Sequence, residues 1–528
     1  RMTRAVRISF YAIASLFVLL VTLAGWIVFF FDASKLQEPI ANLVESRSGY
    51  RFSFDGPIQI DFDLDNGLVA RVAFSEVSLV KIGGMTTTRA LDIDSLSLNL
   101  NWTQIKGMLS GEHIQGVGSF VISQIDIPAL SQELDVDWTI FNSNAFQQAS
   151  GRGDFEISNR QIEVRDFQFQ IADTQVSGAL VIKDWEKTPS SQFEISIPTL
   201  DIRHYLRTDH QSFLDGFILL SLPALAVSAI DVEGLVSIGS LHSAGIVMKD
   251  VRVPVHSRDG QVVSSPVSAK LYGGSILIDT LMSREDDRAY FYSYQQITDI
   301  QIGQALADIG LTEMVEARAD LDLALAFSSQ DLSEGMTSAD GVILLTGING
   351  KLKGFDLQRL IQQLTEGDNV DASLWLGDGL TTPVGDFSVS VKVANGRVES
   401  EDLAIEIADL EARGAGQYRL ESERLNYRLL LSLEGSDVAK LLPAPLNSGL
   451  MVLPLKISGN REKPDVSIDM PAFFQIQMNH LMGGSSPIKK QAVDPESVSK
   501  LRVIQATVNK GINAFVTNRL LEVEVKAE

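Results

Sequence analysis

Apolar and polar residues alternate, one residue apart, through most of the chain. A period of two places one apolar and one polar face on each β-strand. The apolar residues hold a single parity in five segments: Phe167, Phe169, Ile171; Phe193, Ile195, Ile197; Leu321, Leu323, Leu325, Phe327; Phe387, Val389, Val391, Val393; and Leu403, Ile405, Ile407. The pattern predicts a mainly β fold, an antiparallel sheet of many short strands.

Turn residues separate these segments and predict hairpins at Asp65-Asn66-Gly67, Asn349-Gly350 and Asn395-Gly396. The apolar parity changes near Asp94 and Ser95, which predicts a β-bulge that redirects the strand. Gly414-Ala415-Gly416 is interpreted as a turn between strands, because it lacks the third glycine and the βαβ setting of a dinucleotide site.

Few helices are predicted. Short ones are expected at residues 34–45, 302–309 and 357–364. The last helix begins at Asp494-Pro495, an N-cap followed by a first-turn proline. Its apolar residues then repeat at helical spacing: Val498, Leu501, Val508, Ile512, Phe515 and Val516. We expect this amphipathic helix to pack against the β body, with docking to a membrane or partner as the alternative; residues 483–494 before it have a linker composition.

An uncharged, strongly apolar run extends from Ile8 to Phe31 and ends at Asp32. A helix of this length can cross a hydrocarbon core of ~30 Å. Arg1, Arg4 and Arg7 precede the run, which predicts a cytoplasmic N-terminus and export of the rest of the chain. The run is too long for the apolar core of a signal peptide and is not closed by an A-x-A site, so we expect an uncleaved single-pass anchor rather than a cleaved signal.

Composition narrows the function. The net charge is −23, with 67 acidic against 44 basic residues, which argues against nucleic acid as a partner because phosphate binding needs a basic face. The chain has no cysteine, which excludes thiol catalysis, disulfides and cysteine-bearing metal sites. Nearly five hundred residues follow the anchor, enough for several domains or one extended architecture.

No motif for catalysis, metal or cofactor binding emerges. The six histidines are separated or lie on unrelated turns, and no H-E-x-x-H spacing occurs: His113, His204, His210, His242, His256 and His480. Ser497 to Lys500 formally matches S-x-x-K, but its companion motifs are missing. We therefore predict no catalytic residues, no metal, no cofactor and no enzymatic activity.

Several phrases of the sequence resemble the AsmA family, inner-membrane-anchored proteins of diderm bacteria. They occur in family order behind the apolar run and include LQEPIANLVESRSGYRFSFDGPIQI, LDIDSLSLNLNWTQIKGMLSGEHIQGVGSFVIS, VSGALVIKDWEKTPSSQFEISIPTLDIRHYL and MVLPLKISGNREKPDVSID. The most specific is SAKLYGGSILID, whose Leu271-Tyr272-Gly273-Gly274 resembles a family strand-and-bulge. GVILLTGINGKLKGFDLQRLI and the stretch from Val389 to Leu433 resemble the family's C-terminal region, whereas the tail from Pro471 onward matches less well.

The resemblance implies an elongated, twisted β-sheet curled into an apolar groove that holds phospholipid acyl chains, in a protein that supports lipid transport between the inner and outer membranes. It also implies that most of the chain lies in the periplasm, and it is compatible with an outer-membrane or periplasmic protein partner. The alternative function is a non-enzymatic scaffold for outer-membrane protein biogenesis; an envelope hydrolase ranks third.

Candidates for the groove follow from the same-parity strands: Phe167, Phe169, Ile171, Leu323, Leu325, Phe387, Val389, Val391 and Val393. Periodicity alone is far more typical of the inside of a closed β-sandwich, and the apolar run at the N-terminus, the number of consecutive strands and the family resemblance favour the groove instead. At ~4.8 Å per strand, about thirty strands would span ~150 Å, so a partial conduit and a full bridge both stay open. We predict five regions: 1–31, the anchor; 32–150, an N-terminal β region; 151–330, the central groove; 331–482, a C-terminal β region; and 483–528, the linker and helix.

Overall fold

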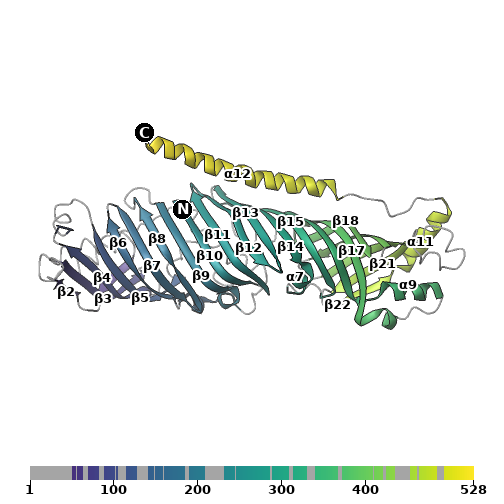
Figure 1. The fold of residues 1–528 in the computed structure, drawn as a ribbon, viewed down its shortest axis with the longest axis horizontal. Helices are drawn as coiled ribbons and strands as arrows, with labels where there is room; N and C mark the ends of the chain where they lie inside the picture. Colours follow the sequence, from purple (N-terminus) through teal and green to yellow (C-terminus); the bar gives the residue numbers. More distant parts are fainter. Residues whose placement is uncertain are drawn as a thin grey trace. The chain divides into compact units, whose positions relative to one another are not determined.

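A computed structural model describes residues 50–527 of the chain, with short gaps at connections and longer ones at 82–88, 105–114, 128–140, 208–230, 330–338, 434–451 and 484–492. The described residues are mainly β, as predicted, with 22 strands and few helices (Figure 1). They divide into two compact units, Arg1–Ser264 (unit 1) and Ser265–Glu528 (unit 2), which are described separately.

Unit 1 is a sheet in which each strand from β3 onward pairs with the next. Its strands are β1 (Tyr50–Phe54), β2 (Ile58–Asp63), β3 (Val69–Lys81), β4 (Arg89–Asn101), β5 (Gly116–Ile125), β6 (Ala149–Ser158), β7 (Gln161–Ile171), β8 (Thr174–Lys183), β9 (Ser190–Asp201), β10 (Asp231–Ser243) and β11 (Ile246–Arg258). β1 and β2 both pair with β3 at one edge. The helices described here are α5 (Ser143–Gln147) and the 3₁₀ helix η4 (Ile202–Tyr205).

One pairing in unit 1 corrects the prediction of a purely antiparallel sheet. β10 runs parallel to β9, with Phe193 opposite Gly234 and Ile197 opposite Ile238. Parallel neighbours need a crossover of a dozen or more residues, because the chain must return to the same end of the sheet. Residues 202–230 provide that connection, so the sheet is mixed.

Unit 2 carries antiparallel strands from β13 to β22, each paired with the next. β12 (Gln261–Leu271) leads into it. The strands are β13 (Gly274–Glu285), β14 (Arg288–Gln301), β15 (Val315–Ser329), β16 (Asp340–Phe355), β17 (Leu376–Ala394), β18 (Arg397–Ile407), β19 (Leu410–Arg419), β20 (Arg424–Ser432), β21 (Val452–Asn460) and β22 (Lys463–Ile468). The helices are α7 (Ile302–Asp308), α9 (Leu357–Glu366), η5 (Ala372–Leu374), α11 (Met470–Leu481) and α12 (Pro495–Ala527).

The predicted turns have mixed outcomes. Asn395 and Gly396 both take positive φ and join β17 to β18, which confirms a two-residue hairpin turn. Asn349 and Gly350 instead lie inside β16, so the turn predicted there is wrong. Gly414 to Gly416 is likewise interior to β19 and not a turn. The segment at 65–67 falls outside the described residues.

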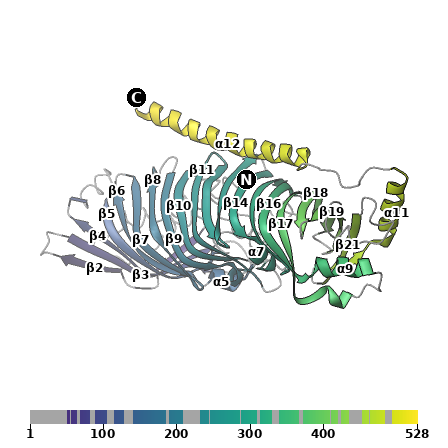
Figure 2. The same ribbon diagram turned by 45° about the vertical axis from the view of Figure 1, so that its right-hand side comes forward.

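Bulges interrupt several strands and are marked by a left-handed Asp or Asn. The ladder shifts register around Asp166 in β7, Asp299 in β14 and Asn349 in β16, where φ is 48°, 57° and 51°. A bulge adds a residue to one strand, so it bends that strand and restores the parity of its apolar side chains. Figure 2 shows the resulting bend of individual strands. The bulge predicted near Asp94 is confirmed by the register shifts between Asp92 and Ser95.

The helix predictions in unit 2 are confirmed: α7 and α9 match the predicted segments, and α12 begins at Pro495 with Asp494 as its cap. The Asp494 carboxylate accepts hydrogen bonds from the backbone N–H groups of Glu496 and Ser497, both at 3.2 Å. α11 and α5 were not predicted. The helix predicted at 34–45 lies outside the described residues.

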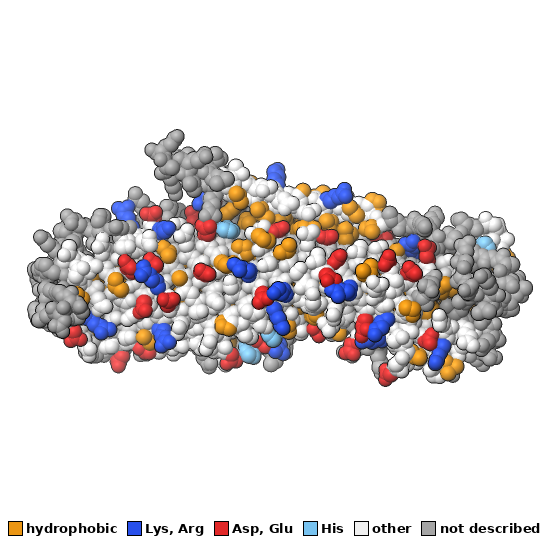
Figure 3. All heavy atoms as spheres, viewed as in Figure 1, with side chains coloured by type: hydrophobic (Ala, Val, Ile, Leu, Met, Phe, Trp, Pro, Cys, Tyr) orange, Lys and Arg blue, Asp and Glu red, His pale blue; other side chains and the backbone are white. Residues whose placement is uncertain are grey.

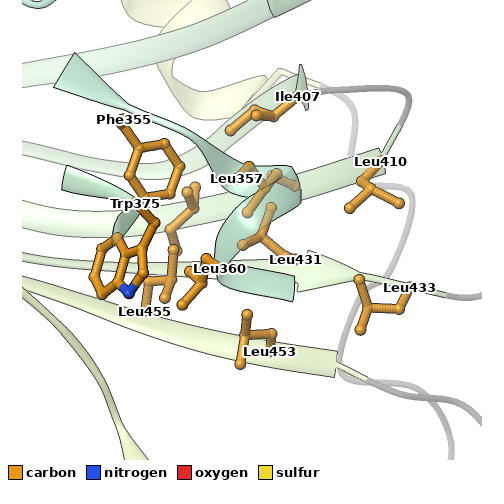
Figure 4. Close-up of a cluster of buried hydrophobic side chains, with 12 residues drawn as sticks. Phe355, Leu357, Leu360, Trp375, Ile407, Leu410, Leu431, Leu433, Leu453 and Leu455 are labelled. Atoms are coloured by element: carbon orange, nitrogen blue, oxygen red, sulfur yellow. The ribbon is translucent and has the colours of Figure 1, made fainter. Parts of the chain in front are cut away.

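In the main core of unit 2, α9 packs against strands β18–β21 (Figure 4). Leu357 and Leu360 of α9 pack with Leu431 and Leu453 from β20 and β21. A Thr382 hydroxyl fixes the start of the helix: it donates to the Phe355 carbonyl at 2.6 Å and accepts from the Leu357 N–H at 3.0 Å. Here the sheet's apolar side chains are covered by the protein itself.

This core yields a stability prediction. Leu360→Ala should lower the free energy of unfolding of unit 2 by about 2–5 kcal/mol, because Leu360 is 0% exposed and its removal leaves a cavity. Leu374→Ala is the matched control: Leu374 lies nearby in η5 but is 50% exposed, so the change should be within about 0.5 kcal/mol. Denaturant unfolding followed by circular dichroism measures both; equal losses would contradict the core assignment.

Candidate functional site

The apolar face of unit 1 is continuous across ten strands. Directly opposed residues in a ladder place their side chains on the same face. One row of such residues crosses the sheet, with one residue from each strand paired to the next. From β2 to β11 it consists of Ile60, Val72, Leu98, Gly118, Phe155, Val164, Leu180, Phe193, Gly234 and Val255. Every residue of this row is apolar or glycine, so the row forms one uninterrupted apolar strip.

Aromatic rings on this face lie over glycines of the neighbouring strand. A Cβ on Gly151 would lie 2.1 Å from the ring of Phe169, and a Cβ on Gly234 would lie 2.5 Å from the ring of Phe193. Phe169 also lies beside Phe167, with ring centroids 5.5 Å apart. Because glycine has no side chain, the rings pack directly against the backbone of the neighbouring strand, which gives the face a low, smooth surface.

The predicted site residues of unit 1 share this face. Phe167 opposes Gly178, Phe169 opposes Gly151 and Val176, and Ile171 opposes Ala149. Phe167 is buried, and Phe169 and Ile171 are half-buried. The glycines and the alternating residues of β9 and β10 belong to the same surface, although sequence reasoning did not select them as site residues; glycine spacing opposite phenylalanines was the available signal.

A second apolar face runs through β13–β17 of unit 2. One row joins Ile276, Ile297, Leu321, Leu345 and Val389, and the next joins Ile278, Gln295, Leu323, Ile343 and Val391. A third row places Leu325 opposite Gly341, and Gly341 opposite Val393. Phe387 opposes Gly347. The structure therefore brings all six predicted site residues of this unit to one face: Leu323, Leu325, Phe387, Val389, Val391 and Val393.

α12 covers the opposite face of the same strands. Its Leu501, Ile504 and Val508 form a cluster with Tyr294, Ala324 and Val342. Those three sheet residues are one position along from Gln295, Leu323 and Ile343, so their side chains point away from the apolar face. Gly511 permits the close approach, because a Cβ there would lie 2.2 Å from Leu281 of β13. Figures 1 and 3 show α12 along these strands, with hydrophobic side chains gathered around it.

The predicted packing of the last helix is thus confirmed, with a different stripe. Leu501, Val508 and Ile512 contact the sheet as expected, together with Ile504. Val516 is exposed instead. Ile504 packs in the same cluster as Tyr294 of β14 and Ala324 of β15.

Two helices cover the ends of the apolar face of unit 2. Ile302 and Leu306 of α7 pack against Leu321, Leu345 and Phe387. α9 covers the continuation on β19–β21. The part between them belongs to none of the clusters that α7, α9 and α12 form, and its side chains are half-buried: Leu323, Leu325, Ile343, Val391 and Val393. This is the open section of the face within the described residues.

Polar contacts hold the start of α12. The buried Asp402 carboxylate accepts from the Ser390 N–H at 2.8 Å, from the Ser390 hydroxyl at 2.5 Å and from the Asp494 N–H at 2.7 Å. Lys392 donates to Glu496 at 2.8 Å and forms an ion pair with Asp494 at 2.9 Å. Lys500 pairs with Asp340. Of the formal S-x-x-K pair, Lys500 thus contacts the sheet, whereas the Ser497 hydroxyl donates to the Asp494 carboxylate at the start of the helix, at 2.9 Å.

These contacts predict that docking of α12 depends on pH. The hydrogen bond from Lys392 holds the pKa of Asp494 at about 2, below its unfolded value near 4. The stabilisation is therefore complete above about pH 4 and is lost as the pH falls toward 2. Hydrogen exchange at Leu501–Val508, corrected for intrinsic rates, should accelerate over that window. Lys392→Met should exchange faster already at pH 7 and show a weaker acid response; an unchanged profile in this variant would contradict the contact's role.

Other features of the described chain do not form a site. Two hollows are lined by Ser123, Gln124, Asn144, Gln147 and Ser150, and by α12 residues with Val493; neither includes the apolar faces. Within the described ranges, no group of three or more histidines and carboxylates could hold a metal ion. No described helix is long and apolar enough to span a bilayer, and the predicted anchor from Ile8 to Phe31 lies outside those ranges.

Comparison with known proteins gives one match. Residues 172–403 match the model of the AsmA family, a stretch that runs from the end of β7 to β18 and includes the open apolar section of unit 2. No curated protein and no solved structure shows significant similarity to the chain. The family match confirms the resemblance found in the sequence motifs, and residues 172–403 are recognised as AsmA family sequence.

Proposed function

We propose that this protein binds phospholipid acyl chains along its apolar faces and supports lipid transport between the inner and outer membranes. The observation that carries the proposal is the open section of unit 2, where half-buried Leu323, Leu325 and Val391 share one face while α12 covers the other. The AsmA family match supports an envelope-related, lipid-transport-like function.

The physical basis is burial of hydrocarbon. An apolar sheet face is stabilised by cover from a second layer or a ligand. An acyl chain contributes about 0.8 kcal/mol per buried CH₂ and needs no directional partner, so it can lie along a row of Leu, Val, Phe and Gly. Headgroups would stay in water at the rim. The smooth surface made by rings over Gly151 and Gly234 suits a ligand that slides.

The proposal places the chain in the inner membrane with its bulk in the periplasm. The apolar run from Ile8 to Phe31 and the arginines before it support this placement. A tether would set the β body beside a lipid reservoir. The proposed role is non-enzymatic and needs no cofactor.

Lipid analysis of the gently purified full chain tests the proposal. We expect phospholipid to copurify in native mass spectrometry. A Leu325→Asp/Val391→Asp double variant should carry less phospholipid, because it loses the lipid on unit 2 and keeps any lipid bound on unit 1 or around residues 8–31. A scaffold for outer-membrane protein biogenesis, the alternative function, should come away with the same lipid content in both forms, and that result would contradict the proposal.

A further inference from the structure

α11 presents a row of large apolar side chains to solvent. Met470, Phe474, Met478, Leu481 and Met482 are 45%, 61%, 55%, 75% and 72% exposed. At 100° per residue these positions fall within about 120° of arc, so they form one stripe about 18 Å long. A contiguous exposed apolar stripe of this kind marks a contact with a partner or a membrane.

The opposite side of α11 is fixed to the sheet. Phe473 packs against the core of unit 2, and its ring lies 5.8 Å from that of Phe474. Asp469 caps the helix by accepting from the Ala472 N–H at 3.1 Å, and its carboxylate pairs with Arg428 at 3.1 Å. Its own N–H donates to the Pro454 carbonyl of β21 at 2.9 Å. These contacts attach α11 to the sheet by its other side, so the stripe faces solvent.

Charge distinguishes this segment from the rest of the chain. No Asp or Glu occurs from Met470 to Val493, whereas the whole chain has 67 acidic residues and a net charge of −23. The only Lys or Arg residues in that stretch are Lys489 and Lys490. Gln475 and Asn479, which flank the stripe, are uncharged and exposed. An apolar stripe without negative charge, followed by lysines, is complementary to an anionic lipid surface.

We propose that α11 is a membrane-contact helix that lies in the interface of an anionic phospholipid bilayer, with its Met, Phe and Leu side chains among the acyl chains. The inference goes beyond the proposed function and does not depend on what occupies the apolar faces. A protein partner is the competing occupant. Specific protein interfaces surround their apolar centre with a polar rim that forms directional hydrogen bonds. Along one side the stripe is bordered by the amides of Gln475 and Asn479, which carry no charge, and this favours lipid.

The chain has no cysteine, so a single introduced thiol reports on one position. In the experiment, the full-length Leu481→Cys variant is labelled with an NBD fluorophore at position 481 and held in nanodiscs of unlabelled lipid. Vesicles with spin-labelled phosphatidylcholine, with or without phosphatidylglycerol, are then added. We expect a blue shift and quenching with phosphatidylglycerol vesicles. Leu374→Cys, 50% exposed in η5, is the matched control and should stay unquenched.

Two variants in the labelled chain sharpen the test. Phe474→Asp/Met478→Asp should reduce quenching to background, and Phe474→Ala/Met478→Ala should weaken it without adding charge. An unchanged melting temperature shows that either variant is folded. No quenching at position 481, or equal quenching at 374, would overturn the membrane assignment in favour of a protein partner. Equal quenching by vesicles without phosphatidylglycerol would overturn the choice of an anionic surface.

Discussion

Val391→Asp is expected to abolish phospholipid photo-crosslinking from the apolar face of unit 2 while leaving membrane insertion intact. Val391 of β17 lies in the row with Ile343 and Leu323, in the open section; Leu325 of β15 lies in the next row, two strands away. Moving a carboxylate out of water into contact with acyl chains costs several kcal/mol. That penalty exceeds the gain from several buried CH₂ groups. A photo-crosslinker at Leu325 should therefore capture lipid in the parent chain and none in the variant.

The matched control is Thr346→Asp. Thr346 is exposed on β16, and its parity places it on the face that α12 shares, away from Leu345 and Gly347. The same charge is thus added a short distance away on the wrong side of the sheet, and crosslinking from Leu325 should persist. Unchanged crosslinking in Val391→Asp, with an unaltered circular dichroism spectrum, would show that the face is not where the lipid binds.

Gly151→Val is expected to destabilise unit 1 by about 1–3 kcal/mol, the range for forcing extra methyl groups into a packed site. The Phe169 ring occupies the space where a Gly151 side chain would begin, with its Cδ1 2.1 Å from an added Cβ. The Phe169 ring must therefore move away from the sheet, and in doing so it loses its contact with Phe167. Denaturant unfolding of unit 1 measures the loss.

A double-mutant cycle separates this contact from any general effect of valine in β6. Phe169→Ala alone should destabilise unit 1, because it exposes the glycine and removes a large apolar side chain. Gly151→Val/Phe169→Ala should be more stable than the sum of the single changes predicts, since the valine fills space vacated by the ring. Additive losses would mean that the two residues do not compete for the same volume.

Alternation alone was enough to predict the strands and the shared faces. Leu323 and Val391 are far apart in sequence, yet each lies on the apolar parity of its strand, and antiparallel pairing through Ile343 leaves no other face for them. The N-cap at Asp494 was equally predictable, because its side chain acts within one turn. These features were predictable because strand alternation and helix capping depend only on residues close together in the sequence.

Other features depend on contacts that no local pattern carries. The parallel pairing of β9 and β10 is one of them, because the alternation within each strand does not distinguish a parallel from an antiparallel neighbour. Asn349 and Gly350 have turn residue types, but β16 uses them for a bulge because its partner β15 continues past that point. Which face α12 covers follows from Ala324 and Val342, small enough to admit Leu501 and Val508. α11 was not predicted because its apolar residues are not confined to one side: Phe473 packs against the core, whereas Phe474 belongs to the exposed stripe.

The central claim, that phospholipid acyl chains lie on one face of the sheet, is tested most directly by a photo-crosslinking scan along β9. A photoreactive side chain is placed in turn at Phe193, Ile195 and Ile197, whose side chains are half-buried on the apolar face, and at Glu194 and Ser196, which are exposed on the other. We predict that lipid adducts in the full-length membrane-embedded chain alternate with a period of two, strong at the first three positions and absent at the other two. Equal labelling at all five positions, or no lipid adduct at any, would contradict the account.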